Sequence, residues 1–551
     1  MPIANRTDSA QWRARLPHIA EWRKFGLFTG RNLAAAIEEG LTRYAATPVV
    51  FAIEQRVQET SAGELWSAAS RVAGGLLARG MRSGDAIVTQ LPNCREMMLI
   101  FLAALKLGLV LVPVVHIYGA AELGYILRTS RARALVMPGR WRKVDFAARI
   151  RALESTPDLE MIFSVGDTAL PGPCHAWSEL ETWRGPQAET SSTVGDDICI
   201  MNFTSGTTSA PKGVMLSHHA LQAAAYCYPP PGVDIDDGPV LNYGPAGHIG
   251  PLARLPRPFL LGDRIIHVDQ FEAEFILDLY ERYRVARTGG VPTHLNALLD
   301  ACGERLPASI TNMLVGATSV PPALVARIER LGVRTMRSWG CTEQVGITAG
   351  SPHDPLEKRV NTDGRPVAHN QVRAVDDSGR AVPAGEPGEL ISLGPQMFQG
   401  YLDASLDEAA FTGDGFYRTG DIGVIDRDGY VTIVDRKKDI VVRGGENISS
   451  REVEELLLRH PAVREAAVVG WPDQRLGERV GAFVQLNPGT SLTVAEIRTL
   501  FEGLGVARQK TPEHLVIVPE FPRTPIGKVI KAELRKQIAL SAPSSSAPAS
   551  P

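Results

Sequence analysis

Short apolar runs alternate with amphipathic segments along the chain up to about residue 363. Apolar runs bounded by turn residues indicate buried strands, and spacings of three and four indicate helices. An alternation of this kind favours an α/β fold with largely parallel sheets. The predicted strands include residues 86–89, 134–137, 198–201 and 313–315, and helical patterns lie at 63–79 and 275–282.

Beyond residue 363 the pattern changes to short β runs separated by Asp- and Gly-containing turns. This pattern predicts a small antiparallel, β-barrel-like region. The charged stretch 435–439 interrupts two apolar runs, and an amphipathic helix with a serine at its start follows at 450–458. We therefore predict a large N-terminal domain of stacked α/β sheets at 1–435 and a small α+β domain at 436–540. The Ser, Ala and Pro residues of 541–551 predict a disordered tail.

The most apolar segment, residues 97–115, is nearly long enough to span a membrane. Lys106, Gly108 and Pro113 interrupt it, so a buried helix followed by a strand is expected and no membrane span. A net charge of −3 makes nucleic acid an improbable partner. Six scattered cysteines without metal-ligand spacing, and no secretory signal, favour a reduced, cytoplasmic setting.

The segment 204–213 follows an apolar strand and combines hydroxyl residues, two glycines and Lys212. Glycines allow backbone N–H groups to approach anionic oxygens, hydroxyls donate hydrogen bonds and a lysine adds positive charge. These are the components of a phosphate-binding loop, although the spacing is not that of the P-loop NTPases. A polar surface turn is the alternative that composition alone leaves open.

With this loop, the chain resembles the adenylate-forming superfamily of acyl-CoA synthetases, firefly luciferase and peptide-synthetase adenylation domains. Its motifs most resemble those of bacterial fatty-acid or alicyclic-acid CoA ligases. The resemblance runs from about residue 33 to residue 535 with the motifs in family order, and Ser209 stands where glycine is commoner. It implies an acid-thiol ligase that uses ATP, Mg²⁺ and CoA. The loop residues that it assigns to the phosphates are Thr204, Ser205, Gly206, Thr207, Thr208 and Lys212.

The segment 338–343 matches the family motif beside the nucleotide. The resemblance implies that Trp339 stacks on adenine next to Gly340, that Thr342 contacts the α-phosphate and that Glu343 binds Mg²⁺. A carboxylate suits a hard cation. In the segment 417–421 the resemblance implies that Asp421 binds the ribose hydroxyls, with Arg436 as a second contact. The two acceptor oxygens of a carboxylate suit a pair of hydroxyls.

Lys528, in the segment 525–528, matches the family's catalytic lysine, and Lys531 is a weaker candidate for that role. An ammonium between the substrate carboxylate and the α-phosphate would offset charge in the transition state. Asp435 matches the hinge about which the small domain is thought to move. Gly444 and Gly445 match the segment that lines the pantetheine path in CoA-using members.

His248, in the segment 245–250, occupies the family's acid-pocket motif, and Gly316 and Ala317 are expected beside it and the nucleotide. A structural, hydrogen-bonded histidine is the alternative for His248. No aspartate lies between residues 243 and 251, so an uncharged carboxylic acid is expected as the small-molecule substrate, because an unpaired ammonium is costly to bury. The predicted function is an acyl-CoA ligase for a fatty, alicyclic or steroid side-chain acid. The alternatives are a fatty acyl-AMP ligase that loads a carrier protein, an aryl-acid CoA ligase and a non-enzymatic nucleotide-binding protein; the sequence leaves the oligomeric state undetermined.

Overall fold

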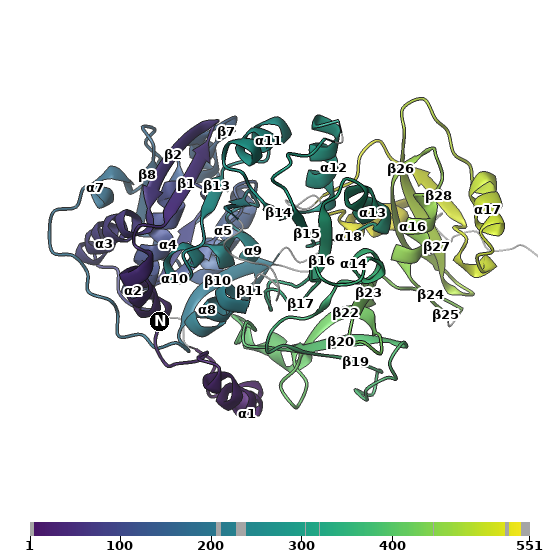
Figure 1. The fold of residues 1–551 in the computed structure, drawn as a ribbon, viewed down its shortest axis with the longest axis horizontal. Helices are drawn as coiled ribbons and strands as arrows, with labels where there is room; N and C mark the ends of the chain where they lie inside the picture. The colour runs from purple at the N-terminus through teal and green to yellow at the C-terminus, as the bar shows by residue number, and fades with distance from the viewer. Residues whose placement is uncertain are drawn as a thin grey trace, which may run out of the picture.

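The structure, a computed structural model, describes residues 5–204, 211–227, 238–303, 305–318, 320–444, 446–523 and 528–541. Two large sheets occupy the N-terminal part, a four-stranded sheet follows them, and a further sheet with its helices forms the C-terminal part at the opposite end of the molecule (Figure 1). The predicted α/β class, with a large N-terminal region of sheets and a smaller C-terminal region, is confirmed.

The first large sheet has a parallel centre, and its edges are antiparallel. Its spatial order is β18-β17-β16-β15-β14-β12-β13-β1-β2. The strands are β1 (Pro48–Ile53), β2 (Arg56–Ser61), β12 (Val240–Asn242), β13 (Ile265–Val268), β14 (Arg287–Gly290), β15 (Asn312–Val315), β16 (Arg334–Trp339), β17 (Thr348–Ala349) and β18 (Arg365–Pro366).

The second large sheet has the order β21-β11-β10-β4-β3-β5-β8-β9, and its strands from β10 to β9 are parallel. The strands are β3 (Ala86–Thr89), β4 (Val110–Pro113), β5 (Ala134–Pro138), β8 (Met161–Val165), β9 (Cys174–Ala176), β10 (Ile198–Thr204), β11 (Lys212–Ser217) and β21 (Gly400–Tyr401), with a separate hairpin of β6 (Arg140–Trp141) and β7 (Val144–Asp145). The predicted strands at 86–89, 134–137, 198–201 and 313–315 are all confirmed. The segment 97–115 is a buried helix followed by β4, and Gly108 ends that helix at φ +69°.

Helices cover both large sheets (Figure 1). The predicted helices at 63–79 and 275–282 correspond to α3 and α11. The helices of this part are α1 (Ala10–Lys24), α2 (Leu33–Tyr44), α3 (Ala62–Ala78), α4 (Arg95–Leu107), α5 (Ala120–Ser130), α6 (Phe146–Arg151), α7 (Ser178–Glu181), α8 (His218–Cys227), α9 (Ile249–Arg254), α10 (Arg257–Leu260), α11 (Ala273–Arg282), α12 (Pro292–Ala301), α13 (Pro322–Arg330) and α14 (Leu356–Asn361). Among the described residues, no helix combines the length and apolar composition needed to cross a bilayer.

The region after residue 363 contains a four-stranded antiparallel sheet, as its turn pattern predicts. Its strands are β19 (Gln371–Val375), β20 (Pro387–Leu393), β22 (Tyr417–Ile425) and β23 (Val431–Arg436), and the short helices η2 (Ala404–Leu406) and α15 (Asp407–Ala410) lie between β21 and β22. Asp435 and Arg436 belong to β23, so the break predicted at 435–439 begins too early. The last turn before the C-terminal part is η3 (Lys437–Asp439).

The C-terminal part has its own sheet and its own buried clusters, separate from those of the large sheets. Ser449, and not Ser450, caps α16: its hydroxyl accepts from the Glu452 N–H. The helix α18 includes Ser541, the first residue of the predicted tail; residues 542–551 lie outside the described chain. The elements are β24 (Val441–Arg443), β25 (Glu446–Ile448), α16 (Ser450–Leu457), β26 (Val463–Asp473), β27 (Gly477–Leu486), α17 (Val494–Gly503), η4 (Arg508–Lys510), β28 (His514–Ile517) and α18 (Lys531–Ser541).

Candidate active site

Strand pairing brings the phosphate-loop strands to Glu343. Thr204 ends β10 and Lys212 begins β11, and the two residues are paired in register. The other neighbour of β11 is β21, which carries Tyr401. The Tyr401 hydroxyl donates to Glu343 Oε1 at 2.8 Å, and the Lys212 ammonium lies 4.9 Å from the centroid of the Tyr401 ring. Tyr401 thus connects the predicted phosphate-side lysine to the predicted metal ligand.

The tip of the loop, with Ser205, Gly206, Thr207 and Thr208, lies outside the described residues. Its two flanks are held by the β10–β11 pairing, and the Tyr125 hydroxyl donates to the carbonyl of Pro211 at 3.3 Å. The second large sheet therefore fixes Thr204 and Lys212, described residues on either side of the loop tip.

Trp339, Asp421 and Arg436 form a contiguous group. The indole N–H of Trp339 donates to Asp421 Oδ2 at 2.8 Å, and Arg436 Nε lies 2.6 Å from Asp421 Oδ1. Asp421 on β22 and Arg436 on β23 are register partners, so the sheet itself holds the ion pair together. Burial raises the pKa of Asp421, and the positive charge of Arg436 opposes that rise. An acceptor carboxylate beside a flat ring is suited to a ribose with its base.

Lys528 lies in the electrostatic environment of the same group. Burial, followed by repulsion from Arg436, lowers the pKa of Lys528 to about 8, and attraction to Asp421 partly offsets this. Lys528 is separated from Asp421 by more than a hundred positions in the sequence, yet the fold brings the two together. The segment 524–527 before it lies outside the described residues.

His248 is at the N-cap position of α9, and its side chain makes no capping bond. Burial, and then the charge of Lys528, lowers the pKa of His248 to about 4, so its imidazole is neutral at physiological pH. The segment before it packs closely on the end of β4, because a Cβ on Gly247 would lie 2.3 Å from the Val115 nitrogen. His116, next to Val115, also acts on the pKa of His248. Sequence reasoning missed His116, since no motif marks it.

The remaining nucleotide-side candidates lie at the ends of β15 and β16. Gly316 donates its N–H to the Gly290 carbonyl at 3.2 Å, and a Cβ there would lie 2.5 Å from Ser338 Oγ. Ala317 has φ +66°, and Gly340 packs on the backbone of Gly346. Thr342 lies between Gly340 and Glu343 in the loop that follows β16. This arrangement places the candidates from residue 316 to residue 343 at one edge of the first large sheet.

Gly444 is not brought to this group. It has φ +59° and bonds through its N–H to the Leu476 carbonyl at 2.7 Å, within the C-terminal part. Gly445 lies outside the described residues. The hydrogen bond of Gly444 is therefore made within the C-terminal part, and the role of the predicted pantetheine segment stays a prediction.

Asp435, the predicted hinge, is buried near the end of β23, where its carboxylate accepts hydrogen bonds from four groups. The donors are the hydroxyls of Ser449 and Ser450 and the backbone N–H groups of Arg436 and Arg451. Its role as a hinge stays a prediction.

The side chains of this site suit a metal ion that is bound jointly by the protein and by substrate phosphates. Among the described residues, no group of three or more His, Cys, Asp or Glu side chains could hold a metal ion by itself. Mg²⁺, however, is commonly held by one or two carboxylates together with substrate phosphates. Glu343 beside the phosphate-loop strands meets that requirement.

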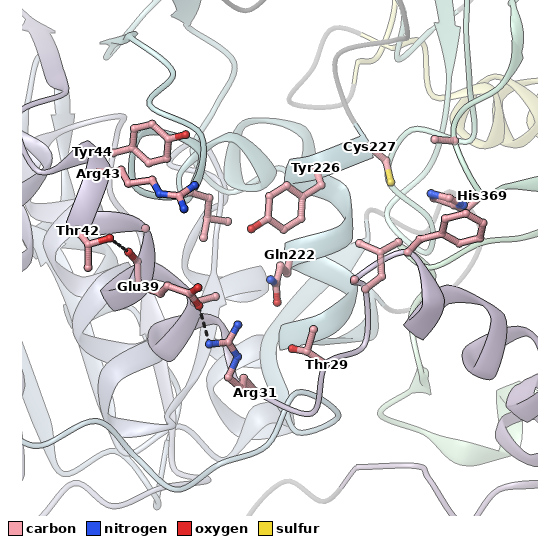
Figure 2. Close-up of a pocket in the computed structure, with 17 residues that line it drawn as sticks. Thr29, Arg31, Glu39, Thr42, Arg43, Tyr44, Gln222, Tyr226, Cys227 and His369 are labelled. Carbon is pink, nitrogen blue, oxygen red and sulfur yellow. Dashed lines mark hydrogen bonds and ion pairs between the residues drawn. The ribbon is translucent and has the colours of Figure 1, made fainter.

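A cavity of about 510 Å³ lies elsewhere, between α2, α8 and the loop before α2. Figure 2 shows Arg43, Gln222 and Tyr226 around it. None of its lining residues is among the predicted site residues. It is therefore distinct from the group around Glu343 and Asp421.

Family models match most of the chain. The AMP-binding enzyme model covers residues 37–402, and the model of the AMP-binding enzyme C-terminal domain covers residues 452–528. The chain belongs to the AMP-binding enzyme family. It is an adenylate-forming ligase of the acyl-CoA and aryl-CoA type, and the predicted resemblance is confirmed.

Relatives of this ligase act on different acids. The medium-chain fatty-acid–CoA ligase of Escherichia coli is 35% identical, over 94% of this chain and 92% of the relative. The 2-hydroxy-7-methoxy-5-methyl-1-naphthoate–CoA ligase of Streptomyces carzinostaticus is 32% identical, over 94% and 95%. The structure of the O-succinylbenzoate coenzyme A synthetase of Bacillus subtilis in complex with ATP and magnesium ion is 25% identical, with a TM-score of 0.78 over 92% of this chain and 99% of that chain.

Proposed function

We propose that this ligase converts an uncharged carboxylic acid and ATP to acyl-AMP and pyrophosphate, and then transfers the acyl group to CoA with release of AMP. Fatty, alicyclic and steroid side-chain acids are the proposed substrate class. The observation that carries the proposal is the convergence of Lys528 on the Asp421–Arg436 pair, which lies beside Trp339. A cation at that point serves a reaction at the α-phosphate.

In the first step a carboxylate oxygen of the acid attacks the α-phosphorus, and the bond to the pyrophosphate oxygen breaks. Asp421 and Trp339 bind the nucleoside and fix its orientation, and Lys212 contacts the departing pyrophosphate. The ammonium of Lys528 offsets the negative charge that the acid and the α-phosphate bring together. Glu343, together with the phosphates, would hold Mg²⁺, which would neutralise further negative charge.

In the second step the thiolate sulfur of CoA attacks the acyl carbonyl carbon, and the bond from that carbon to the phosphate oxygen of AMP breaks. Movement of the small domain about Asp435 would bring Gly444 and Gly445 to the acyl group in place of Lys528. The neutral imidazole of His248 presents no charge to the acid. An uncharged acid is proposed because residues 243–251 contain no carboxylate to pair with a substrate ammonium.

The variant Lys528→Ala tests the proposed function by separating adenylate formation from thioester formation. We expect Lys528→Ala to lower acid-dependent exchange of pyrophosphate into ATP by a factor on the order of a thousand, while supplied acyl-AMP is still converted to the thioester. Equal loss of both half-reactions would contradict the role of Lys528.

A panel of carboxylic acids, assayed for AMP release with CoA, tests the substrate class. Consumption of CoA supports the CoA ligase. Pyrophosphate exchange without CoA consumption would favour the alternative, a ligase that loads a carrier protein, and a clear preference for aromatic acids would favour the aryl-acid ligase.

A further inference from the structure

Lys531 is the first residue of α18, and it makes two short polar contacts with α16. Its ammonium donates to Ser450 Oγ at 2.6 Å and lies 2.7 Å from Glu454 Oε1. Only 17% of the side chain of each ion-pair partner is exposed. Burial opposes the charge on Lys531, but Glu454, Asp439 and Asp435 outweigh it and raise the pKa. Lys531 is therefore charged at physiological pH.

Ser450 connects Lys531 to Asp435 through hydrogen bonds. The Ser450 hydroxyl, which is fully buried, lies 3.0 Å from Asp435 Oδ2. The hydroxyl of Ser449 and the N–H of Arg451 also donate to Oδ2, at 3.1 and 3.2 Å. A chain of hydrogen bonds therefore runs from Lys531 through Ser450 to the last residues of β23.

The same lysine lies close to Lys528 along a fixed stretch of backbone. Val529 forms a β-bridge with Arg523, and the Ile530 N–H donates to the Pro522 carbonyl at 2.8 Å. After Lys531, the helix is anchored by Leu534 and Ile538, which are buried with Phe483 in the C-terminal part. A displacement of the start of α18 must therefore move Lys528 as well.

We propose that Lys531 is a positioning residue that, through Ser450 and Asp435, fixes Lys528 in the arrangement that forms the adenylate. The β22–β23 pair carries Asp421 and Arg436 at one end of this link, and at the other end Lys531 begins α18 and Lys528 lies three residues before it. The proposal rests on the proposed function, because it assigns Lys531 to the step that Lys528 serves. Loss of the hydrogen bonds from Lys531 through Ser450 to Asp435 misplaces Lys528. It leaves the nucleotide contacts of the N-terminal part intact.

The test is Lys531→Met, which keeps the apolar stem and removes the ammonium. We expect kcat for pyrophosphate exchange to fall between about tenfold and a hundredfold, since a small misplacement of a catalytic group has effects of this size. The KM for ATP should change less than about twofold, and conversion of supplied acyl-AMP to the thioester should be retained. Lys531→Arg should restore most of the exchange activity.

Lys510→Met is the matched control. Lys510 also pairs with a glutamate of α16, with its ammonium 2.6 Å from Glu452 Oε1. Among the described contacts, Glu452 is linked to Asp435 through its backbone N–H and the Ser449 hydroxyl, and its carboxylate takes no part in that link. We expect this variant to retain exchange activity. Ser450→Ala, which keeps the Lys531–Glu454 pair, should reproduce the loss of kcat in part and shows whether the effect follows the hydroxyl link.

Three results would overturn the inference: equal loss in both half-reactions, an equal loss in Lys510→Met, or no loss in Ser450→Ala and Lys531→Met. The double variant Lys528→Ala with Lys531→Met should exchange no more slowly than Lys528→Ala alone, and a further loss would also contradict it. If the unsubstituted ligase shows no acid-dependent exchange, the proposed function fails, and if Lys528→Ala retains exchange, the role of Lys528 in that function fails. If Lys528→Ala loses exchange and Lys531→Met does not, only the positioning role fails.

Discussion

At the scale of single residues, Lys528 lies where burial and Arg436 both disfavour its ammonium form. The pKa of about 8 places its titration within the range of ordinary assays. Asp421 limits the lowering of the Lys528 pKa, because its carboxylate attracts both Lys528 and Arg436. The charge that the proposed reaction needs is therefore sensitive to modest changes of pH.

We expect kcat/KM for pyrophosphate exchange to fall as pH rises through about 8, approaching tenfold per pH unit above it, because only protonated Lys528 carries the charge. The profile of kcat/KM reports the free enzyme, which is the state described. Lys528→Arg should be slower but should lose this alkaline limb, since a guanidinium stays protonated. Persistence of the limb in Lys528→Arg would assign the titration to another group.

Tyr401 shows why part of the site could not be predicted. Its hydroxyl bonds Glu343 and its ring faces Lys212, but these contacts depend on the pairing of the two-residue strand β21 with β11. Neither composition nor periodicity specifies a pairing between strands so far apart in sequence. Asp421 and Lys528 could be proposed from the sequence because short motifs surround them, and their roles stay predictions.

At the scale of elements, uninterrupted apolar runs located the central strands well, because strands covered on both faces need apolar side chains throughout. The end of β23 could not be placed in the same way. Asp435 is a charged residue next to other charged residues, a pattern that predicts a turn, yet hydrogen bonds from α16 bury its carboxylate within the strand. The helix cap is Ser449, one residue before the predicted Ser450: both hydroxyls donate to Asp435, and that of Ser449 also accepts from the Glu452 N–H.

The connection between β12 and α9 leads to a prediction at this scale. Gly247→Ala would place a Cβ 2.3 Å from the backbone nitrogen of Val115, so the segment that carries His248 must shift away from β4. We expect a loss of about 1–3 kcal/mol in the free energy of unfolding, together with a fall in exchange activity. Chemical denaturation and the exchange assay measure the two effects.

Gly250→Ala is the matched control, because a Cβ there meets nothing within 4 Å. This variant should change the free energy of unfolding by less than about 0.5 kcal/mol. Similar destabilisation by both substitutions would show that the close approach at Gly247 is not the cause.

At the scale of the whole molecule, the C-terminal part has buried clusters of its own. Ile497 is fully buried in one of them, and Ile276 is fully buried against the first large sheet. Cores that share no residues can unfold as separate cooperative units. The division of the chain after residue 435 stays a prediction that unfolding experiments can test.

We expect two transitions in calorimetry. Ile497→Ala should lower the midpoint temperature of one transition and Ile276→Ala that of the other. Each substitution should remove about 2–5 kcal/mol from the free energy of unfolding of its own part. A single transition that both substitutions shift equally would show that the two parts unfold together.

The order of the site residues along the chain has a consequence for synthesis on the ribosome. Lys212, Trp339, Glu343 and Asp421 all precede Lys528, and translation proceeds from the N-terminus. A nascent chain can therefore fold the proposed nucleotide-binding surface before it possesses the lysine that is proposed to act at the α-phosphate. Such a chain could hold ATP without consuming it or releasing a reactive adenylate, and chemistry would begin only when the last helix, α18, is in place.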